Sequence, residues 1–123
     1  MLFRSNADKK AGALSGGNRR RIELARAMLH EPKLLLMDEA TVGLDIQSRA
    51  DLRKLILSLR DESGVAILWA THLAEEVADA DRVILLHKGK ILRDTTPAEL
   101  MKSTGSSTIE EAFLALTEPK KAA

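Results

Sequence analysis

The chain has 123 residues, of which 45% are hydrophobic and 2% aromatic, so it can form at most one globular domain with an aliphatic core. Its formal net charge of +1 gives no basic excess of the kind that nucleic-acid binders show, and we expect no nucleic-acid partner. It contains no cysteine, which excludes disulfides and thiolate metal sites, and no apolar run reaches the roughly 18 residues that span a bilayer. Any membrane role must therefore come through a partner.

The first informative stretch is Leu14-Ser15-Gly16-Gly17, which precedes a predicted helix from Asn18 to about His30. Glycines let the backbone approach an anion, and the unpaired N–H groups at a helix N-terminus favour negative charge, so this stretch suits a phosphate. A plain turn and helix cap is the alternative interpretation. The apolar stripe of the helix is predicted to comprise Ile22, Ala25 and Leu29.

The apolar run from Leu34 to Met37 is typical of a strand that is buried on both faces, as in a parallel sheet between helices. Asp38 and Glu39 follow at its carboxyl end, the edge at which open α/β sheets bind their ligands. Two adjacent carboxylates at such an edge suit a metal ion and a water molecule. The alternative is that they only cap a loop.

Asp45 precedes a second predicted helix, from Ile46 to about Glu62, and its carboxylate can cap the first turn. Gly64 should end this helix. The run from Val65 to Ala70 predicts a second buried strand, parallel to the first through a right-handed helical crossover, and His72 follows it. The apolar stripe of the second helix is predicted to comprise Leu52, Leu55, Ile56 and Leu59.

The last third of the sequence predicts a hairpin with strands at Val83–Leu86 and Ile91–Arg93. Thr96 to Glu99 has the spacing of a capping box and predicts a short helix to about Lys102. Thr108 to Glu111 repeats this spacing before a last helix. The core face of that helix is predicted to comprise Ile109, Ala112, Phe113 and Leu116.

Four motifs in a fixed order, LSGGN, LLLMDE, VGLD and the lone His72, resemble the nucleotide-binding domain of ATP-binding-cassette (ABC) ATPases from about Ala11 to Leu116. The resemblance implies that the signature loop, which contacts the ATP of a partner domain, contains Ser15, Gly16 and Gly17. It implies that Asp38 holds Mg²⁺ through water, that Glu39 orients or deprotonates the attacking water, and that His72 contacts the γ-phosphate. The implied D-loop residues at the dimer interface are Gly43 and Asp45.

The phosphate loop of the family, G-x-x-x-x-G-K-[ST], does not occur in these 123 residues. We therefore expect the C-terminal half of an ABC ATPase domain without its Walker A half. The expected fold is α/β, a partial RecA-like P-loop NTPase with a parallel sheet flanked by helices, a C-terminal β-hairpin and two short helices. Residues 1–13 would be a remnant of the helical subdomain, residues 14–116 the ATPase part and residues 117–123 a tail.

The function implied by the resemblance is that of an ATP-binding subunit of an ABC transporter, with ATP and Mg²⁺ as cofactors. Its expected partners are a second nucleotide-binding domain, a transmembrane permease that holds it at the cytoplasmic face of the membrane, and an N-terminal fragment that carries Walker A. We expect the chain alone not to hydrolyse ATP. The alternatives are a non-enzymatic module that lends its signature loop to a complete ABC subunit, and an inactive relic.

In this family the strand that feeds the phosphate loop lies between the strands predicted at Val65–Ala70 and Val83–Leu86. Without it, the facing edges of these two strands should be unpaired, and such edges invite pairing with another chain.

Overall fold

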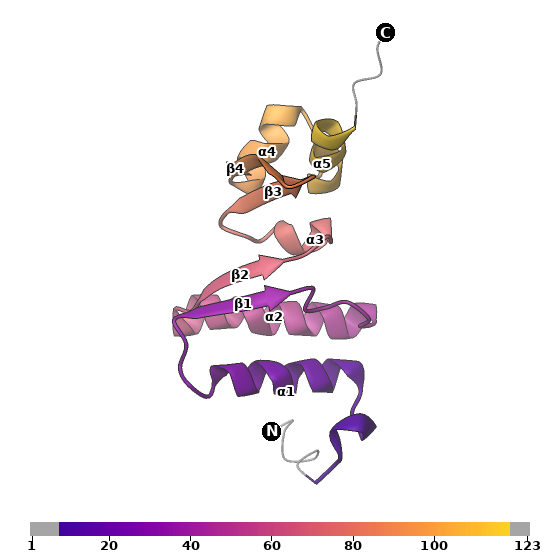
Figure 1. The fold of residues 1–123 in the computed structure, drawn as a ribbon, viewed down its shortest axis with the longest axis vertical. Coiled ribbons are helices and arrows are strands. Elements are labelled where there is room, and N and C mark those ends of the chain that lie inside the picture. Colours follow the sequence, from indigo (N-terminus) through magenta and orange to yellow (C-terminus); the bar gives the residue numbers. More distant parts are fainter. Residues whose placement is uncertain (1–7, 119–123) are drawn as a thin grey trace. The chain divides into compact units, whose positions relative to one another are not determined.

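A computed structural model describes residues 8–118 of the chain, which forms two compact units, Met1–Ala70 and Thr71–Ala123 (Figure 1). The first unit contains the short 3-10 helix η2 (Ala11–Ala13), α1 (Gly16–Met28), β1 (Leu34–Asp38), α2 (Ile46–Ser63) and β2 (Ala66–Ala70). The second unit contains α3 (Ala74–Val77), β3 (Val83–His87), β4 (Lys90–Thr95), α4 (Pro97–Thr104) and α5 (Ile109–Thr117). We describe each unit by itself.

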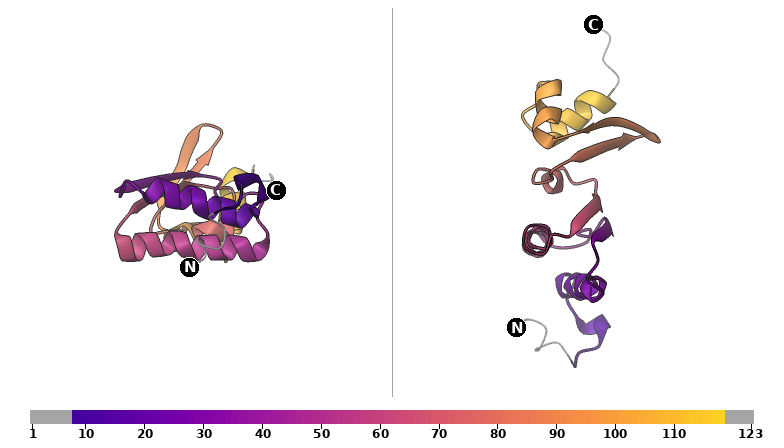
Figure 2. Two further views of the ribbon diagram at one scale, coloured as in Figure 1. Left: turned by 90° about the horizontal axis from the view of Figure 1, so that it is seen from below. Right: turned by 90° about the vertical axis from the view of Figure 1, so that its left-hand side faces the viewer.

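The first unit is a parallel pair of strands with two helices on one face. β1 and β2 pair from Leu34 opposite Ala66 to Asp38 opposite Ala70. α1 and α2 lie side by side along the strands (Figures 1 and 2). The buried core of the unit comprises Leu24, Leu35, Leu44, Leu52, Ile56 and Val65.

The boundaries of α2 follow from its two caps. Asp45 caps the N-terminus, and Gly64 ends the helix in the left-handed conformation with φ of 65°. The predicted stripe of α2 is confirmed, since Leu52 and Ile56 are buried and Leu55 and Leu59 pack against the same core. A left-handed backbone is unfavourable for a residue with a Cβ atom, which explains why glycine suits the end of the helix.

The prediction that both strands are buried on two faces is wrong for the described residues. Leu34, Leu36 and Leu68 have 53%, 67% and 57% of their surface exposed. The reason is that α1 and α2 cover only the face that carries Leu35 and Met37, and no described element of this unit covers the other face. A run of consecutive apolar residues indicates that both faces of a strand are apolar. Each face is buried only if another element of the structure packs against it.

The predicted stripe of α1 is also wrong. Ile22 and Leu29 are 39% and 76% exposed, and Ala25 is exposed as well. The face that packs on the core instead carries Gly17, Leu24 and the half-buried Met28. α1 has apolar residues on more than one side, so its periodicity alone does not decide which side meets the sheet. The helix begins at Gly16 rather than at Asn18.

The second unit is an antiparallel hairpin packed with two helices. β3 and β4 pair with an irregularity between Leu85 and Leu86. The core of this unit comprises Leu85, Leu100 and Ala112, and Ile109 and Leu116 pack against it as predicted, whereas Phe113 is 39% exposed. Within the described residues β3 pairs only with β4, and in the first unit β2 pairs only with β1.

Helices α4 and α5 begin with the caps that the sequence predicts. Thr96 and Glu99 form the predicted capping box at the start of α4. Thr108 caps α5 by accepting a hydrogen bond from the Glu111 N–H, 3.1 Å away. The Glu111 carboxylate accepts from the N–H of Ser107 at 2.8 Å, so it reaches one residue further back than the capping-box pattern predicts.

Candidate functional site

The glycine pair at the start of α1 touches the start of α2. The Oγ atom of Ser15 accepts a hydrogen bond from the Asn18 N–H at 3.2 Å and so caps α1. A Cβ atom on Gly16 would lie 3.2 Å from Cδ2 of Leu44. A Cβ atom on Gly17 would lie 2.9 Å from Oγ of Ser48, closer than real Cβ contacts, and 3.1 Å from Cβ of Ser48, which is tighter than most of them. Close packing of the two helices therefore favours glycine at residue 17, in addition to any role with an anion.

Asp45 is the matching cap on α2. Its Oδ1 accepts from the Ser48 N–H at 2.8 Å, and its Oδ2 accepts from the Ser48 hydroxyl at 2.9 Å. These hydrogen bonds, the one from the backbone N–H first, hold the pKa of Asp45 below the ordinary aspartate value of 3.8. Gly43, two residues earlier, has φ of 81°, which disfavours any side chain there. The N-terminal ends of α1 and α2 thus form one edge of the first unit.

Ser48 connects the two predicted loops, and sequence reasoning missed it. Its hydroxyl donates to Asp45, and the same side chain occupies the space that a Cβ on Gly17 would need. The sequence held only a weak signal, namely a serine at the third position of the helix that Asp45 caps. No local sequence pattern indicates that this serine contacts Gly17, which lies on a different helix.

The two acidic residues leave the end of β1 in different conformations. Asp38 is the last residue of β1, pairs with Ala70 in the parallel ladder and is exposed. Glu39 has φ of 51°, in the left-handed region that residues with side chains adopt rarely. Its N–H donates to the Ala70 carbonyl at 2.9 Å, and its carbonyl accepts from the Val42 N–H at 3.1 Å. Backbone outliers of this kind cluster at functional sites, where the surrounding structure maintains them, but they also occur in turns, and Glu31 and Lys88 have similar φ values of 48° and 49°.

The donor set at this edge fits a magnesium ion held mainly by water and phosphate. Within residues 8–118 no three His, Cys, Asp or Glu side chains gather into a metal site. Magnesium in phosphate-binding proteins keeps several waters and is held by one or two carboxylates together with the substrate's phosphates. A single carboxylate such as Asp38, exposed at a strand end, meets that requirement without further protein ligands.

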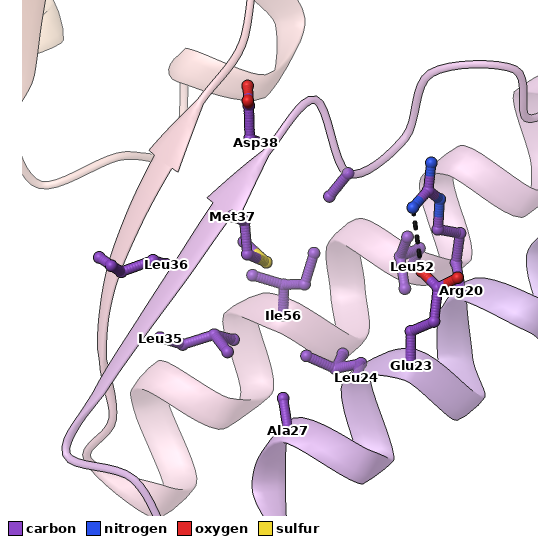
Figure 3. Close-up of a pocket in the computed structure, with 11 residues that line it drawn as sticks. Arg20, Glu23, Leu24, Ala27, Leu35, Leu36, Met37, Asp38, Leu52 and Ile56 are labelled. Carbon is purple, nitrogen blue, oxygen red and sulfur yellow. Dashed lines mark hydrogen bonds and ion pairs between the residues drawn. The ribbon is translucent and has the colours of Figure 1, made fainter.

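A groove of about 200 Å³ lies between α1, β1 and α2 (Figure 3). At its rim Arg20 pairs with Glu23 at 2.9 Å, and Leu35 and Met37 point from β1 toward the helices. Leu36 points away from the helices, consistent with its exposure. The lining of the groove includes four core side chains and, at the end of β1, Asp38, whereas Gly16 and Gly17 do not line it. The groove is therefore a packing feature and does not match a triphosphate, which needs N–H donors and cations.

His72 lies at the beginning of the second unit, in the turn between Thr71 and α3, and its side chain is exposed. The Thr71 hydroxyl accepts a hydrogen bond from the Leu73 N–H at 3.0 Å, across the histidine. It donates its own proton to the carboxylate of Glu76, which is only 6% exposed. A side-chain network therefore holds the turn that carries His72.

Comparisons with known proteins give one consistent result. The ABC transporter family matches residues 2–42. ABC transporter G family member 20 of Dictyostelium discoideum is 44% identical over 108 residues, and the match covers 88% of this chain. The aliphatic sulfonates import ATP-binding protein SsuB of Escherichia coli (strain K12) is 46% identical over 93 residues, or 75% of this chain. The chain belongs to the ABC transporter family.

Solved ABC structures also match the fold. CbiO1 of Clostridium perfringens, described as part of the ABC transporter complex cbiONQ, has a TM-score of 0.70 and 32% identity over 77% of this chain. The ATP-binding cassette MJ0796, solved as a dimer after hydrolysis with ADP and Pi, has a TM-score of 0.63 and 30% identity over 71%. These neighbours confirm the predicted class, an α/β P-loop NTPase fold of which the chain forms part.

The ABC chain is much shorter than these proteins. It spans 15% of the Dictyostelium protein and 36% of SsuB, and 38% of each of the two structural neighbours. Among residues 8–118, no helix has the length and hydropathy needed to cross a membrane.

Proposed function

We propose that this chain is the part of an ABC transporter's ATP-binding subunit that carries the signature loop, the Walker B carboxylates, the D-loop and the switch histidine. The observation that supports this most strongly is the contact of Gly17 with Ser48, because it sets the N-terminus of α1 beside the loop that ends at Asp45. The first turn of α1 contains no acidic residue, so its unpaired N–H groups favour an anion.

In the proposed reaction this edge contacts the ATP bound by a second nucleotide-binding domain. The Ser15 hydroxyl and the N–H groups of Gly16 and Gly17 would donate hydrogen bonds to the γ-phosphate of that partner's nucleotide. Asp45 and Gly43 would lie at the same dimer interface. A glycine pair suits the task because it brings the backbone close to the phosphate while the helix stays packed on α2.

Asp38, Glu39 and His72 would serve the nucleotide that this chain's own domain binds. When bound, Mg²⁺ neutralises phosphate charge, and Asp38 would hold its water ligands. Glu39 would accept the proton of the attacking water, a task for which the left-handed backbone fixes the side chain's starting point. His72 would donate a hydrogen bond to the γ-phosphate.

The proposed partners are a second nucleotide-binding domain, a membrane permease that keeps the subunit at the cytoplasmic face, and a polypeptide that carries the phosphate loop. The exposed leucines of β1 and β2, with 53%, 67% and 57% of their surface accessible, support the last of these because they offer an apolar face. The names of relatives such as SsuB, an import ATP-binding protein, support the permease.

A reconstitution experiment tests the proposal. The pure 123-residue chain should not hydrolyse ATP, because its sequence contains no phosphate loop. Mixing it with an N-terminal fragment that carries the phosphate loop should produce ATP turnover, and the Glu39→Gln variant should abolish that turnover. Hydrolysis by the chain alone would contradict the proposal, and so would a mixture that neither binds nor hydrolyses ATP.

The alternative function is a module that lends only its signature loop to a complete ABC subunit. The packing of Gly16 on Leu44 and Gly17 on Ser48 favours it, since that edge is formed within the first unit alone. In this case adding the chain to a complete ABC subunit should raise ATP turnover. The increase should disappear with Ser15→Ala and persist with Glu39→Gln, whereas an inactive relic would change nothing in either mixture.

A further inference from the structure

Glu76 is a carboxylate that the second unit buries. Only 6% of its surface is exposed, whereas its neighbour Glu75 on the short helix α3 is exposed. A carboxylate that loses water needs hydrogen-bond donors in exchange, or it destabilises the fold. The contacts of Glu76 therefore indicate what its burial achieves.

The Thr71 hydroxyl is one of those donors. It donates to Oε2 of Glu76 and accepts from the Leu73 N–H at 3.0 Å. A hydroxyl has one proton and two lone pairs. When the Glu76 carboxylate accepts the hydrogen bond from this hydroxyl, the hydroxyl's rotation is fixed and a lone pair remains directed at the Leu73 N–H.

The residue enclosed by this arrangement is His72. A threonine oxygen that accepts from the N–H two residues later closes a tight side-chain turn around the residue between them. Leu73, the N-cap residue of α3, has no side-chain cap, so the Thr71 bond is what orders the backbone at the start of this helix. α3 in turn packs against α5, which ties the network to the core of the second unit.

We propose that Glu76 is a positioning residue for His72, acting through the Thr71 hydroxyl. One part of this inference rests on the proposed function, namely that the histidine is oriented toward a γ-phosphate. The hydrogen-bond chain from Glu76 through Thr71 to Leu73 is a property of the 123-residue chain itself. The network needs an acceptor at residue 76 and a hydroxyl at residue 71, and it does not need a negative charge.

The structural part is tested on the whole chain by amide exchange of Leu73 and by the NMR signals of the His72 ring. Glu76→Met and Thr71→Val should speed exchange of the Leu73 amide about fivefold or more, the factor expected for loss of one net hydrogen bond. Glu76→Gln and Thr71→Ser keep the acceptor and the hydroxyl and should preserve wild-type exchange and ring signals. Glu75→Met, an exposed neighbour on the same helix, is the matched control.

Unchanged exchange at Leu73 in both Glu76→Met and Thr71→Val would overturn the proposal. Exchange of the Ala112 amide in α5, which should stay slow in every variant, separates a local opening from unfolding of the unit. If Glu76→Met unfolds the unit, the comparison of Leu73 exchange in Thr71→Val and Thr71→Ser still tests the proposal.

The functional part uses the reconstituted mixture described above. Glu76→Met should lower kcat for ATP by tenfold or more with little change in KM, and Glu76→Gln should restore kcat. If His72→Ala abolishes turnover while Glu76→Met leaves both kcat and Leu73 exchange unchanged, the proposed function stands and the positioning role fails. If His72→Ala leaves turnover unchanged, the role of His72 fails, and Leu73 exchange alone then supports or overturns the positioning by Glu76.

Discussion

Ser48 occupies the place where a side chain on Gly17 would begin, with its Oγ atom 2.9 Å and its Cβ atom 3.1 Å from that point. One serine therefore joins two loops that are separated in the sequence: it packs on the signature loop and donates its hydroxyl to Asp45. Gly17, which we propose to contact a phosphate, thus has a second, structural reason to be a glycine.

We predict that Gly17→Ala destabilises the first unit by about 1–3 kcal/mol, because the new methyl group overpacks the contact between α1 and α2. Ser48→Gly should restore much of this loss in the double variant, since it removes both atoms that the methyl group meets. Urea unfolding of the four chains of this cycle measures the coupling. Gly12→Ala is the control, because nothing lies within 4 Å of a Cβ at Gly12. Simple additivity of the two substitutions would contradict the close contact.

We predict that the first unit loses the stability contributed by the Asp45 carboxylate at acidic pH. Hydrogen bonds from Ser48 hold its pKa below 3.8 in the folded chain, so the unfolded chain binds more protons over the acidic range. Its contribution is present above pH 3.8 and is lost as the pH falls through the folded value. Asp45→Asn keeps a capping side chain, so it should flatten the pH dependence below pH 3.8 while α2 stays capped. A wild-type slope in this variant, measured by thermal unfolding, would exclude Asp45 as the source.

We predict that Glu39→Gly stabilises the first unit and abolishes ATP turnover in the reconstituted mixture. The φ of 51° at Glu39 costs a residue with a side chain about 1 kcal/mol, which glycine avoids. We expect Glu39→Gly to gain up to about 1 kcal/mol in urea unfolding, reduced by the added freedom of the unfolded chain. Glu39→Ala, which keeps the Cβ but loses the carboxylate, is the matched control and should gain nothing. Equal stability of both variants would show that the backbone conformation carries no strain.

The exposed leucines of β1 and β2 should govern association. Leu36→Thr and Leu68→Thr should lower the light scattering of concentrated samples, with a stability change within about 1 kcal/mol, because both side chains are more than half exposed. Leu35→Ala, one residue away but 7% exposed, should instead cost about 2–5 kcal/mol. Unchanged scattering after both leucine substitutions would show that this face does not drive association.

Local chemistry is what the sequence predicts well. Asp45, Thr96 and Gly64 act within one helical turn of their own positions, and the structure has each as the cap that its residue type indicates. The four motif positions likewise follow strand ends and helix starts, which short-range patterns mark.

Which apolar side meets a neighbour could not be predicted. Leu24 rather than Ile22 is buried on α1, and only one face of Leu34–Asp38 is covered, because both outcomes depend on where other elements lie. The contact of Gly17 with Ser48 and the burial of Glu76 depend on packing and on a hydroxyl rotor, for which no residue pattern is specific.

The N–H of Glu39 is held by a main-chain atom, the carbonyl oxygen of Ala70. Replacing the Ala70 side chain leaves that oxygen in place. A substitution of Ala70 should therefore change the backbone geometry at Asp38 and Glu39 very little. Insertion or deletion of one residue in β2 would instead shift the ladder and assign a different carbonyl to Glu39. A change in the length of β2 should therefore disturb the backbone of Glu39 more than a substitution within β2 does.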